Sequence, residues 1–294
     1  MPQGALPEGI EAFCERTNWL LYALVGAGPG GSTIIAKRRR LSDAVVERVV
    51  YEQILPHLPI AAPDYYGSKE DGAFVWFLLQ AVDGARYSES NPEHLAMAAR
   101  WVAAMHTGAM ALTRPLSLPD AGPGRYLAHL ISGRKAIQRS LLTSKRLNRA
   151  SRLILERIVV QLDRTEACWP QICAGCNDAP HTLVHCDFRP KNVLVRRDGT
   201  SLVAFDWETA GWGPPAPDLT RIDVVAYWHA VRKSWAVSLE TVLRWASVGI
   251  VFQKLAAIDW EATDLAFDTP ETLAQPIATL QIVADNLARL AESL

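Results

Sequence analysis

Apolar and polar positions alternate in different ways along the chain, and the first quarter has the pattern of strands. Short apolar runs at 19–25 and 32–37 predict two strands joined by the turn GAGPGG. The segment AFVWFLLQAV, which begins at Ala73, is short, apolar and aromatic, and predicts a buried strand. Helical spacing from about Ser42 to about Leu58 predicts one helix among these strands.

Beyond this region the pattern becomes mainly helical. A short hairpin interrupts it, because NVLVRRDGTSLVAFD places two apolar runs around an Asp-Gly turn. We therefore predict an α+β protein with a small strand-rich part at 1–82 and a larger helical part at 83–294 that carries the hairpin. The expected helical segments lie at about 92–110, 124–140 and 145–166, and again from about Asp218 onward.

Composition narrows the possible partners. The chain has 294 residues, 49% of them hydrophobic, and a net charge of −1. Such a charge creates no overall field for nucleic acid or an anionic membrane, so we expect neither partner. The N-terminal residues lack a basic segment followed by an apolar one, and the apolar runs near 19–25 and 73–81 are too short to span a bilayer. We expect a cytoplasmic protein.

The glycine cluster has the spacing of a dinucleotide-binding loop, with Gly26, Gly28 and Gly31 directly after an apolar run. That site needs a helix that opens inside the cluster, so that its free N–H groups meet the pyrophosphate. The following residues, STIIA, are β-branched and favour a strand instead. We therefore predict a glycine-rich hairpin turn, with a flavin or nicotinamide protein as the alternative.

A more specific pattern lies in the second half of the chain. VHCDFRPKNVLV contains His185-x-Asp187 followed four residues later by Asn192, and the hairpin then leads to Asp206 in FDWE. Protein kinases carry this order of a His-x-Asp-x4-Asn loop, a hairpin and a metal-binding Asp. In such a site Asp187 accepts the proton of the acceptor hydroxyl. Asn192 and Asp206 supply the oxygen ligands that Mg²⁺ prefers.

Together, HCDFRPKNVLV and VAFDWETAGWGPPAPDLTRID resemble the aminoglycoside phosphotransferase and choline kinase family. The resemblance is strong over about 181–223 and implies a two-lobed, protein-kinase-like fold. It implies that His185 braces the loop and that Asp218 is a structural acid at a helix start. Glu208, beside Asp206, is counted as a further supporting residue. One departure is Cys186, where the family usually has Gly.

A kinase-like fold also requires a strand Lys that contacts the α and β phosphates and pairs with a helix Glu. Lys37 is the first charge after an alternating apolar run, so we assign it this role. Two glutamates compete for the pairing. Glu47 falls beside the buried helical stripe and Glu52 lies just beyond its opposite margin, so periodicity favours Glu47.

The same resemblance places the nucleotide. Thr17 and Asn18 resemble the family's short polar loop, and the base would bond to backbone around Gln80–Val82, after FVWFLL. ATP is the expected phosphate donor with Mg²⁺ as its cofactor, and GTP remains possible.

The acceptor is a small hydroxylated molecule whose identity no motif fixes. Trp207 and Trp212 flank the metal Asp and could wall its pocket. Asp259, Glu261 and Asp264 lie in a segment without Lys or Arg, which would suit a cationic acceptor or could simply be solvated.

We therefore predict a phosphotransferase that transfers the γ-phosphoryl group to a small-molecule hydroxyl. An antibiotic of the aminoglycoside kind is the first expected acceptor. A metabolic kinase for choline, an amino sugar or a similar alcohol is the alternative, and a non-catalytic kinase-like binding module is the third possibility. The sequence leaves open whether the protein is a monomer or a homodimer.

Overall fold

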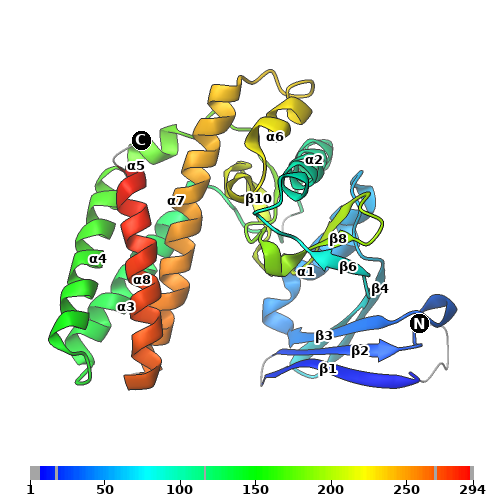
Figure 1. The fold of residues 1–294 in the computed structure, drawn as a ribbon, viewed down its shortest axis with the longest axis horizontal. Coiled ribbons are helices and arrows are strands. Elements are labelled where there is room, and N and C mark those ends of the chain that lie inside the picture. The colour runs from blue at the N-terminus through cyan, green and yellow to red at the C-terminus, as the bar shows by residue number, and fades with distance from the viewer. Residues whose placement is uncertain (1–6, 17–18, 116, 268–269, 292–294) are drawn as a thin grey trace. The chain divides into compact units, whose positions relative to one another are not determined.

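The computed structural model describes residues 7–16, 19–115, 117–267 and 270–291 (Figure 1). The chain divides into two compact units, each assembled from separate stretches of sequence. The first comprises Met1–Pro119, Thr182–Trp212 and Arg221–Ala236, and the second comprises Asp120–His181, Gly213–Thr220 and Val237–Leu294. The lobe boundary predicted at residue 82 falls inside the first unit, and it remains a prediction.

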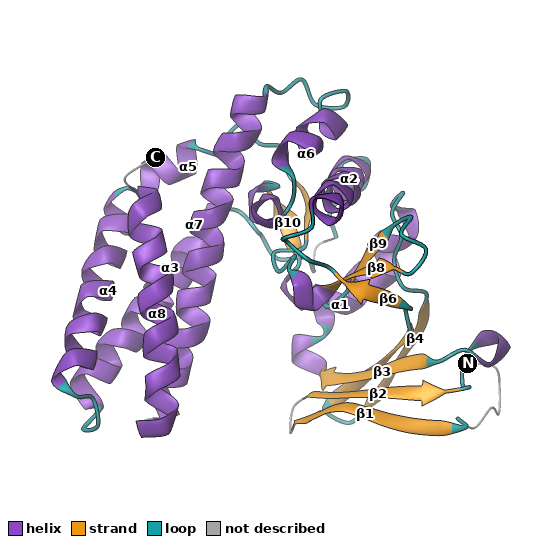
Figure 2. Cartoon of the chain, viewed as in Figure 1, coloured by secondary structure: helices purple, strands orange, loops and turns teal. Residues whose placement is uncertain are grey.

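The first unit is built on a five-stranded antiparallel sheet with the order β1-β2-β3-β5-β4 (Figure 2). In β5 the buried residues Val75, Phe77 and Leu79 alternate with partly exposed ones, so one face of the sheet is apolar and covered. The strands are β1 (Gly9–Arg16), β2 (Trp19–Val25), β3 (Ile34–Arg40), β4 (Tyr65–Asp71) and β5 (Phe74–Gln80).

The covered face of this sheet belongs to the same core as the start of the predicted helix. Ala44, Val75 and Phe77 form a buried cluster, with Leu41 packed against it. The helix itself is α1 (Val45–Val49), and it continues through a π-helical turn at Val50–Ile54 and a 3-10 turn at Leu55–His57. The structure thus confirms a helix over most of the predicted range.

The glycine cluster is a turn between β2 and β3, as predicted. Gly28 N–H donates to the Ser32 carbonyl at 2.7 Å and Gly31 N–H donates to the Gly28 carbonyl at 3.1 Å, which closes the turn. Gly30 lies in the left-handed region at φ 65°. Only a single 3-10 turn, at Pro29–Gly31, forms here, so the turn has no helix N-terminus of the kind that binds a pyrophosphate.

The hairpin near Asp198 forms as β8 (Val193–Arg196) and β9 (Leu202–Ala204), and β6 (Gly84–Arg86) pairs with β8. No strand was predicted from the sequence at β6. Its pairing depends on Gly84, because a β-carbon there would lie 2.4 Å from the Val195 carbonyl oxygen. The first unit also contains α2 (Pro92–Ala109), α6 (Val224–Val231) and β7 (Thr182–Val184). Strand β7 pairs with β10 (Gly211–Gly213), whose last residue is assigned to the second unit.

The second unit is helical. Close packing of α3 on α7 depends on Gly133, since a β-carbon there would lie 3.1 Å from Asp259 Cα, and Tyr126 stacks on Phe252 at 4.1 Å between centroids. Its helices are α3 (Pro123–Thr143), α4 (Arg149–Ala167), α5 (Trp169–Ala174), α7 (Leu239–Asp264) and α8 (Pro270–Ala291). The predicted α+β class is therefore confirmed.

Helix α7 is long and apolar enough to cross a membrane by length and composition alone. More than half of its most apolar window is buried among its neighbours, as the central helix of a packed helical unit requires. One such helix is weak grounds for a membrane span.

Candidate active site

The predicted pairing of Lys37 with Glu47 is present. Lys37 Nζ lies 2.8 Å from both carboxylate oxygens of Glu47, and both side chains are buried. Glu52 lies elsewhere, where it accepts hydrogen bonds from Tyr65 Oη at 2.8 Å and Arg48 Nε at 3.3 Å. Helical periodicity therefore selected the correct glutamate, because of the two only Glu47 lies on the buried face of the helix, toward Lys37 on the sheet.

Asp206 completes a three-residue charge cluster. Its Oδ1 lies 2.6 Å from Lys37 Nζ, although 169 residues separate the two positions in the chain. Burial acts to raise the pKa of Asp206, but the charge and hydrogen bond of Lys37, with the charges of Arg39 and Lys191, lower it below its ordinary value. Asp206 is therefore a carboxylate at neutral pH, which a metal ligand must be.

The loop before the hairpin holds Asp187 and Asn192 against each other. Asn192 Nδ2 donates to Asp187 Oδ2 at 2.8 Å and to the Asp187 carbonyl at 2.9 Å, and both residues are buried. These two bonds use both N–H groups of the Asn192 amide, so its Oδ1 remains as the atom that can bind a cation.

His185 has the bracing contacts that the resemblance implied. Its Nδ1 accepts from Asp187 N–H at 3.3 Å, so Nε2 carries the proton and donates to the Phe205 carbonyl at 3.1 Å. The fully buried ring thereby links the residue before Asp206 to the loop that carries Asp187.

The backbone conformation of Cys186 explains why a glycine would suit this position. Its φ is 63°, in the left-handed region where a β-carbon is strained, and the residue is buried. Asp206 has a similar φ of 69°. Two strained non-glycine residues therefore lie in the loops that carry the charged groups, as is common at active sites.

Three cations near these carboxylates were not assigned a role from the sequence. Arg189 pairs with Asp187 Oδ1, and Lys191 Nζ lies 3.2 Å from Asp187 Oδ2. Arg39 pairs with Glu208, which gives the supporting residue a partner on β3. The positions of Arg189 and Lys191 between Asp187 and Asn192 could have indicated such contacts.

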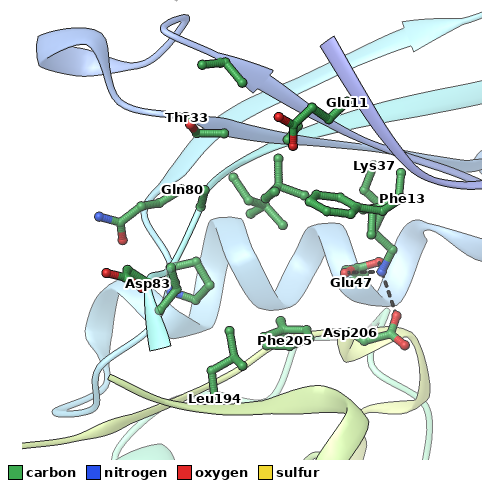
Figure 3. Close-up of a pocket in the computed structure, with 18 residues that line it drawn as sticks. Glu11, Phe13, Thr33, Lys37, Glu47, Gln80, Asp83, Leu194, Phe205 and Asp206 are labelled. Carbon is green, nitrogen blue, oxygen red and sulfur yellow. Dashed lines mark hydrogen bonds and ion pairs between the residues drawn. The ribbon is translucent and has the colours of Figure 1, made fainter. Parts of the chain in front are cut away.

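A cavity of about 750 Å³ lies entirely within the first unit and ends at the charge cluster (Figure 3). Residues 79–83, at the end of β5 and just after it, form the opposite side, where the predicted Gln80 and Val82 both line the cavity. Among the described residues, no hydrogen bond occupies the backbone N–H or C=O of Val82. The remaining lining is mostly apolar: Leu21, Ala23, Val25, Ile35, Pro63, Leu194 and Phe205.

The structure buries the side chains of Trp207 and Trp212, which were expected from the sequence to lie beside the substrate, and their role toward an acceptor stays a prediction. The Trp207 side chain is fully buried, with its ring 4.5 Å from that of His185 and 6.2 Å from that of Trp101. Trp212 is also buried, and its backbone N–H donates to the Pro119 carbonyl at 2.9 Å. Both rings fill the core, and the spacing of residues in the sequence does not reveal this.

Asp218 is buried in the first turn of a 3-10 helix at Ala216–Arg221, in agreement with its expected position at a helix start. In the second unit, Asp259 Oδ2 lies 2.8 Å from His129 Nδ1. Glu261 is partly buried and Asp264 is exposed on the same helix. Their role toward an acceptor stays a prediction, and Thr17 and Asn18 lie outside the described residues.

Two further cavity residues were missed, Glu11 and Phe13 on β1. The alternation in GIEAFCER could have indicated a strand with both side chains on one face. Nothing in the spacing could show that this face lines the cavity, since that depends on how β1 pairs with β2.

A strand Lys paired with a helix Glu, next to a His-x-Asp-x4-Asn loop and a further Asp, defines a kinase-like phosphotransferase. Residues 22–265 match the model of the phosphotransferase enzyme family, and the chain belongs to this family. Family and fold together support a small-molecule kinase, as predicted.

Solved structures confirm the kinase-like fold at low sequence identity. A mutant aminoglycoside 2'-phosphotransferase IIIa in complex with GDP has a TM-score of 0.67 at 13% identity, over 97% of this chain and 94% of that chain. A choline kinase from Cryptosporidium parvum Iowa II has a TM-score of 0.66 at 11% identity, over 96% and 90%. A spectinomycin phosphotransferase with ADP and spectinomycin has 0.62 at 11%, over 97% and 93%. No curated protein matches the sequence.

Proposed function

We propose that this protein transfers the γ-phosphoryl group of ATP to a hydroxyl of a small molecule in a magnesium-dependent reaction. The observation that carries the proposal is the convergence of Lys37, Glu47 and Asp206 at one end of an otherwise apolar cavity. A nucleotide matches this cavity, because it has a flat, largely apolar base at one end and a polyanionic phosphate chain at the other.

The cavity favours one orientation of the nucleotide. Its base would lie against residues 79–83, with the backbone of Val82 available to bond the base edge. The α and β phosphates would then contact Lys37, which Glu47 holds in place from the helix side. GTP fits the same division of the cavity, and the structural relatives were solved with ADP and with GDP.

Asp206 and Asn192 fit a magnesium ion by their chemistry. The lowered pKa of Asp206 keeps it anionic, and the Asn192 amide is fixed with its oxygen available. Both present hard oxygen donors, which Mg²⁺ prefers over nitrogen or sulfur. When bound, the ion would neutralise charge on the phosphates.

Asp187 is the proposed base. The acceptor oxygen forms a bond to the γ-phosphorus while the bond from that phosphorus to the β–γ bridging oxygen breaks. ADP leaves with the bridging oxygen, and the hydroxyl proton passes to the Asp187 carboxylate. The hydrogen bond from Asn192 and the pairing with Arg189 hold that carboxylate in one position.

For the acceptor we propose a hydroxylated antibiotic of the aminoglycoside kind, with the protein as a resistance enzyme in the cytoplasm. Relatives named as aminoglycoside and spectinomycin phosphotransferases support this class. The acidic side chains of Asp259, Glu261 and Asp264 would suit such a cationic acceptor. The choline kinase relative, with a similar TM-score of 0.66, favours a small amino alcohol as the second candidate.

A phosphate-transfer screen tests the proposal. The purified protein is incubated with Mg²⁺ and ATP or GTP, and with aminoglycosides, other hydroxylated antibiotics or amino alcohols, and products are read by mass. One acceptor should gain the mass of a phosphoryl group. Absence of both transfer and magnesium-dependent nucleotide hydrolysis would instead favour a non-catalytic binding module.

A further inference from the structure

Strand β1 contributes an acidic side chain to the candidate nucleotide cavity. Glu11 lines the cavity from this edge strand, directly opposite Ala23 of β2, whose small side chain leaves space beside the carboxylate. Glu11 is exposed, and among the described residues no cation forms an ion pair with it. A free carboxylate in a cavity proposed for a polyanion requires an explanation.

The position of Glu11 between the two ends of the cavity explains this carboxylate, on the basis of the proposed function. Figure 3 shows Glu11 between Thr33, which lies toward Gln80, and Lys37 beside Glu47 and Asp206. A nucleotide with its base near residues 80–82 and its phosphates at Lys37 would place its sugar in this middle part. The carboxylate would then face the sugar and not the phosphates.

The chemistry of a carboxylate agrees with that position. An ionised Glu only accepts hydrogen bonds, and it would repel phosphate oxygens at close range. The sugar of a ribonucleotide carries two neighbouring hydroxyl donors, and acidic residues bind ribose hydroxyls in other nucleotide sites. We propose that Glu11 accepts hydrogen bonds from the ribose 2'- and 3'-hydroxyls and makes the enzyme select ribonucleotides over 2'-deoxyribonucleotides.

Phe13 supports a closed environment for this contact. It is the extra residue of a β-bulge, because Ala12 pairs with Tyr22 and Cys14 with Leu21. Phe13 lines the cavity, and the residue is 61% exposed. Bulges of this kind redirect a side chain. A bound nucleotide would cover the ring, and the ring would exclude water from the hydrogen bonds of Glu11, which strengthens them.

The test compares ATP with 2'-deoxy-ATP in the wild-type protein and in Glu11→Gln, Glu11→Ala and Phe13→Ala. Binding is measured by competition with a fluorescent ATP analogue, and turnover by magnesium-dependent ADP release. The wild type should prefer ATP about 10-fold or more, because a hydrogen bond to a charged group is lost with the 2'-hydroxyl. Glu11→Ala should reduce the preference to within about twofold, and Glu11→Gln should give an intermediate value.

Matched variants separate this effect from others. Phe13→Ala should weaken both nucleotides equally and keep their ratio. Asp71→Asn removes an exposed acid at the end of β4, outside the cavity lining, and should change neither affinity nor ratio.

Two outcomes would overturn the inference while the proposed function survives. In the first, Glu11→Ala keeps the wild-type preference for ATP over 2'-deoxy-ATP. In the second, Glu11→Ala changes the ratio of ATP to GTP affinity but keeps the preference for ATP over 2'-deoxy-ATP, which would assign Glu11 to the base. If the wild type bound neither ATP nor GTP, the proposed function itself would fail.

Discussion

Lys37 and Asp206 form an ion pair of 2.6 Å across 169 residues of sequence. Lys37 also bonds Glu47, so one ammonium joins the N-terminal sheet, helix α1 and the end of the hairpin. In the proposed reaction, this ammonium exchanges the Asp206 contact for the phosphates while Glu47 keeps it in place.

Lys37→Met should cost both stability and nucleotide use. It leaves the buried Glu47 carboxylate without its partner, which typically costs about 3–5 kcal/mol of unfolding free energy. The double variant Lys37→Met with Glu47→Leu should recover much of that stability but no nucleotide use. Urea unfolding and nucleotide binding measure the two effects, and a double variant that regained ATP turnover would contradict the assignment.

Gly28→Ala should cost stability and leave nucleotide affinity unchanged. A β-carbon at Gly28 would lie 2.4 Å from Ser32 Oγ and 2.9 Å from the Ser32 carbonyl oxygen, inside the β2–β3 turn. Forced crowding of this kind costs about 1–3 kcal/mol. A raised KM for ATP with normal stability would mean that the glycine cluster contacts the phosphates. Gly31→Ala, where a β-carbon has open space but φ is 79°, serves as the backbone-strain control.

Asp187→Asn should retain nucleotide binding and lose transfer. The amide keeps the size of the carboxylate but cannot take the hydroxyl proton, so the rate should fall by about 10²–10⁴-fold. Asp198→Asn at the hairpin turn, an exposed position, is the charge control. Undiminished turnover in Asp187→Asn would remove Asp187 from the mechanism.

The pH dependence of stability should report Asp206. Its folded-state pKa is lowered, so the folded protein holds this proton less tightly than the unfolded chain does. The resulting stabilisation is present above the ordinary value of 3.8 and is lost as the pH falls through the lowered value. Asp206→Asn should therefore flatten the acid limb of the stability curve below about pH 4. Equal slopes in the two proteins would contradict the assignment.

Cys186→Gly should be more stable than Cys186→Ala. Both variants lose the buried sulfur, but only glycine removes the β-carbon that is strained at φ 63°. The difference should be about 1 kcal/mol in unfolding free energy, measured in urea. A more stable alanine variant would mean that the loop relaxes around this residue.

Much of this protein was determined by local sequence. The α+β class, the hairpin around Asp198 and the strand after GAGPGG follow from periodicity and turn chemistry, which act over a few residues. Helical spacing even separated Glu47 from Glu52, because the buried face of a helix is fixed by its 3.6-residue period.

Tertiary structure decided what no local pattern could. Trp207 fills the core behind the His185 loop, although its place beside Asp206 suggested a pocket wall. Glu11 reaches the cavity only because β1 pairs with β2 in a particular register. Burial and cavity lining depend on segments far apart in the chain, and such contacts are set by packing and not by the spacing of neighbours.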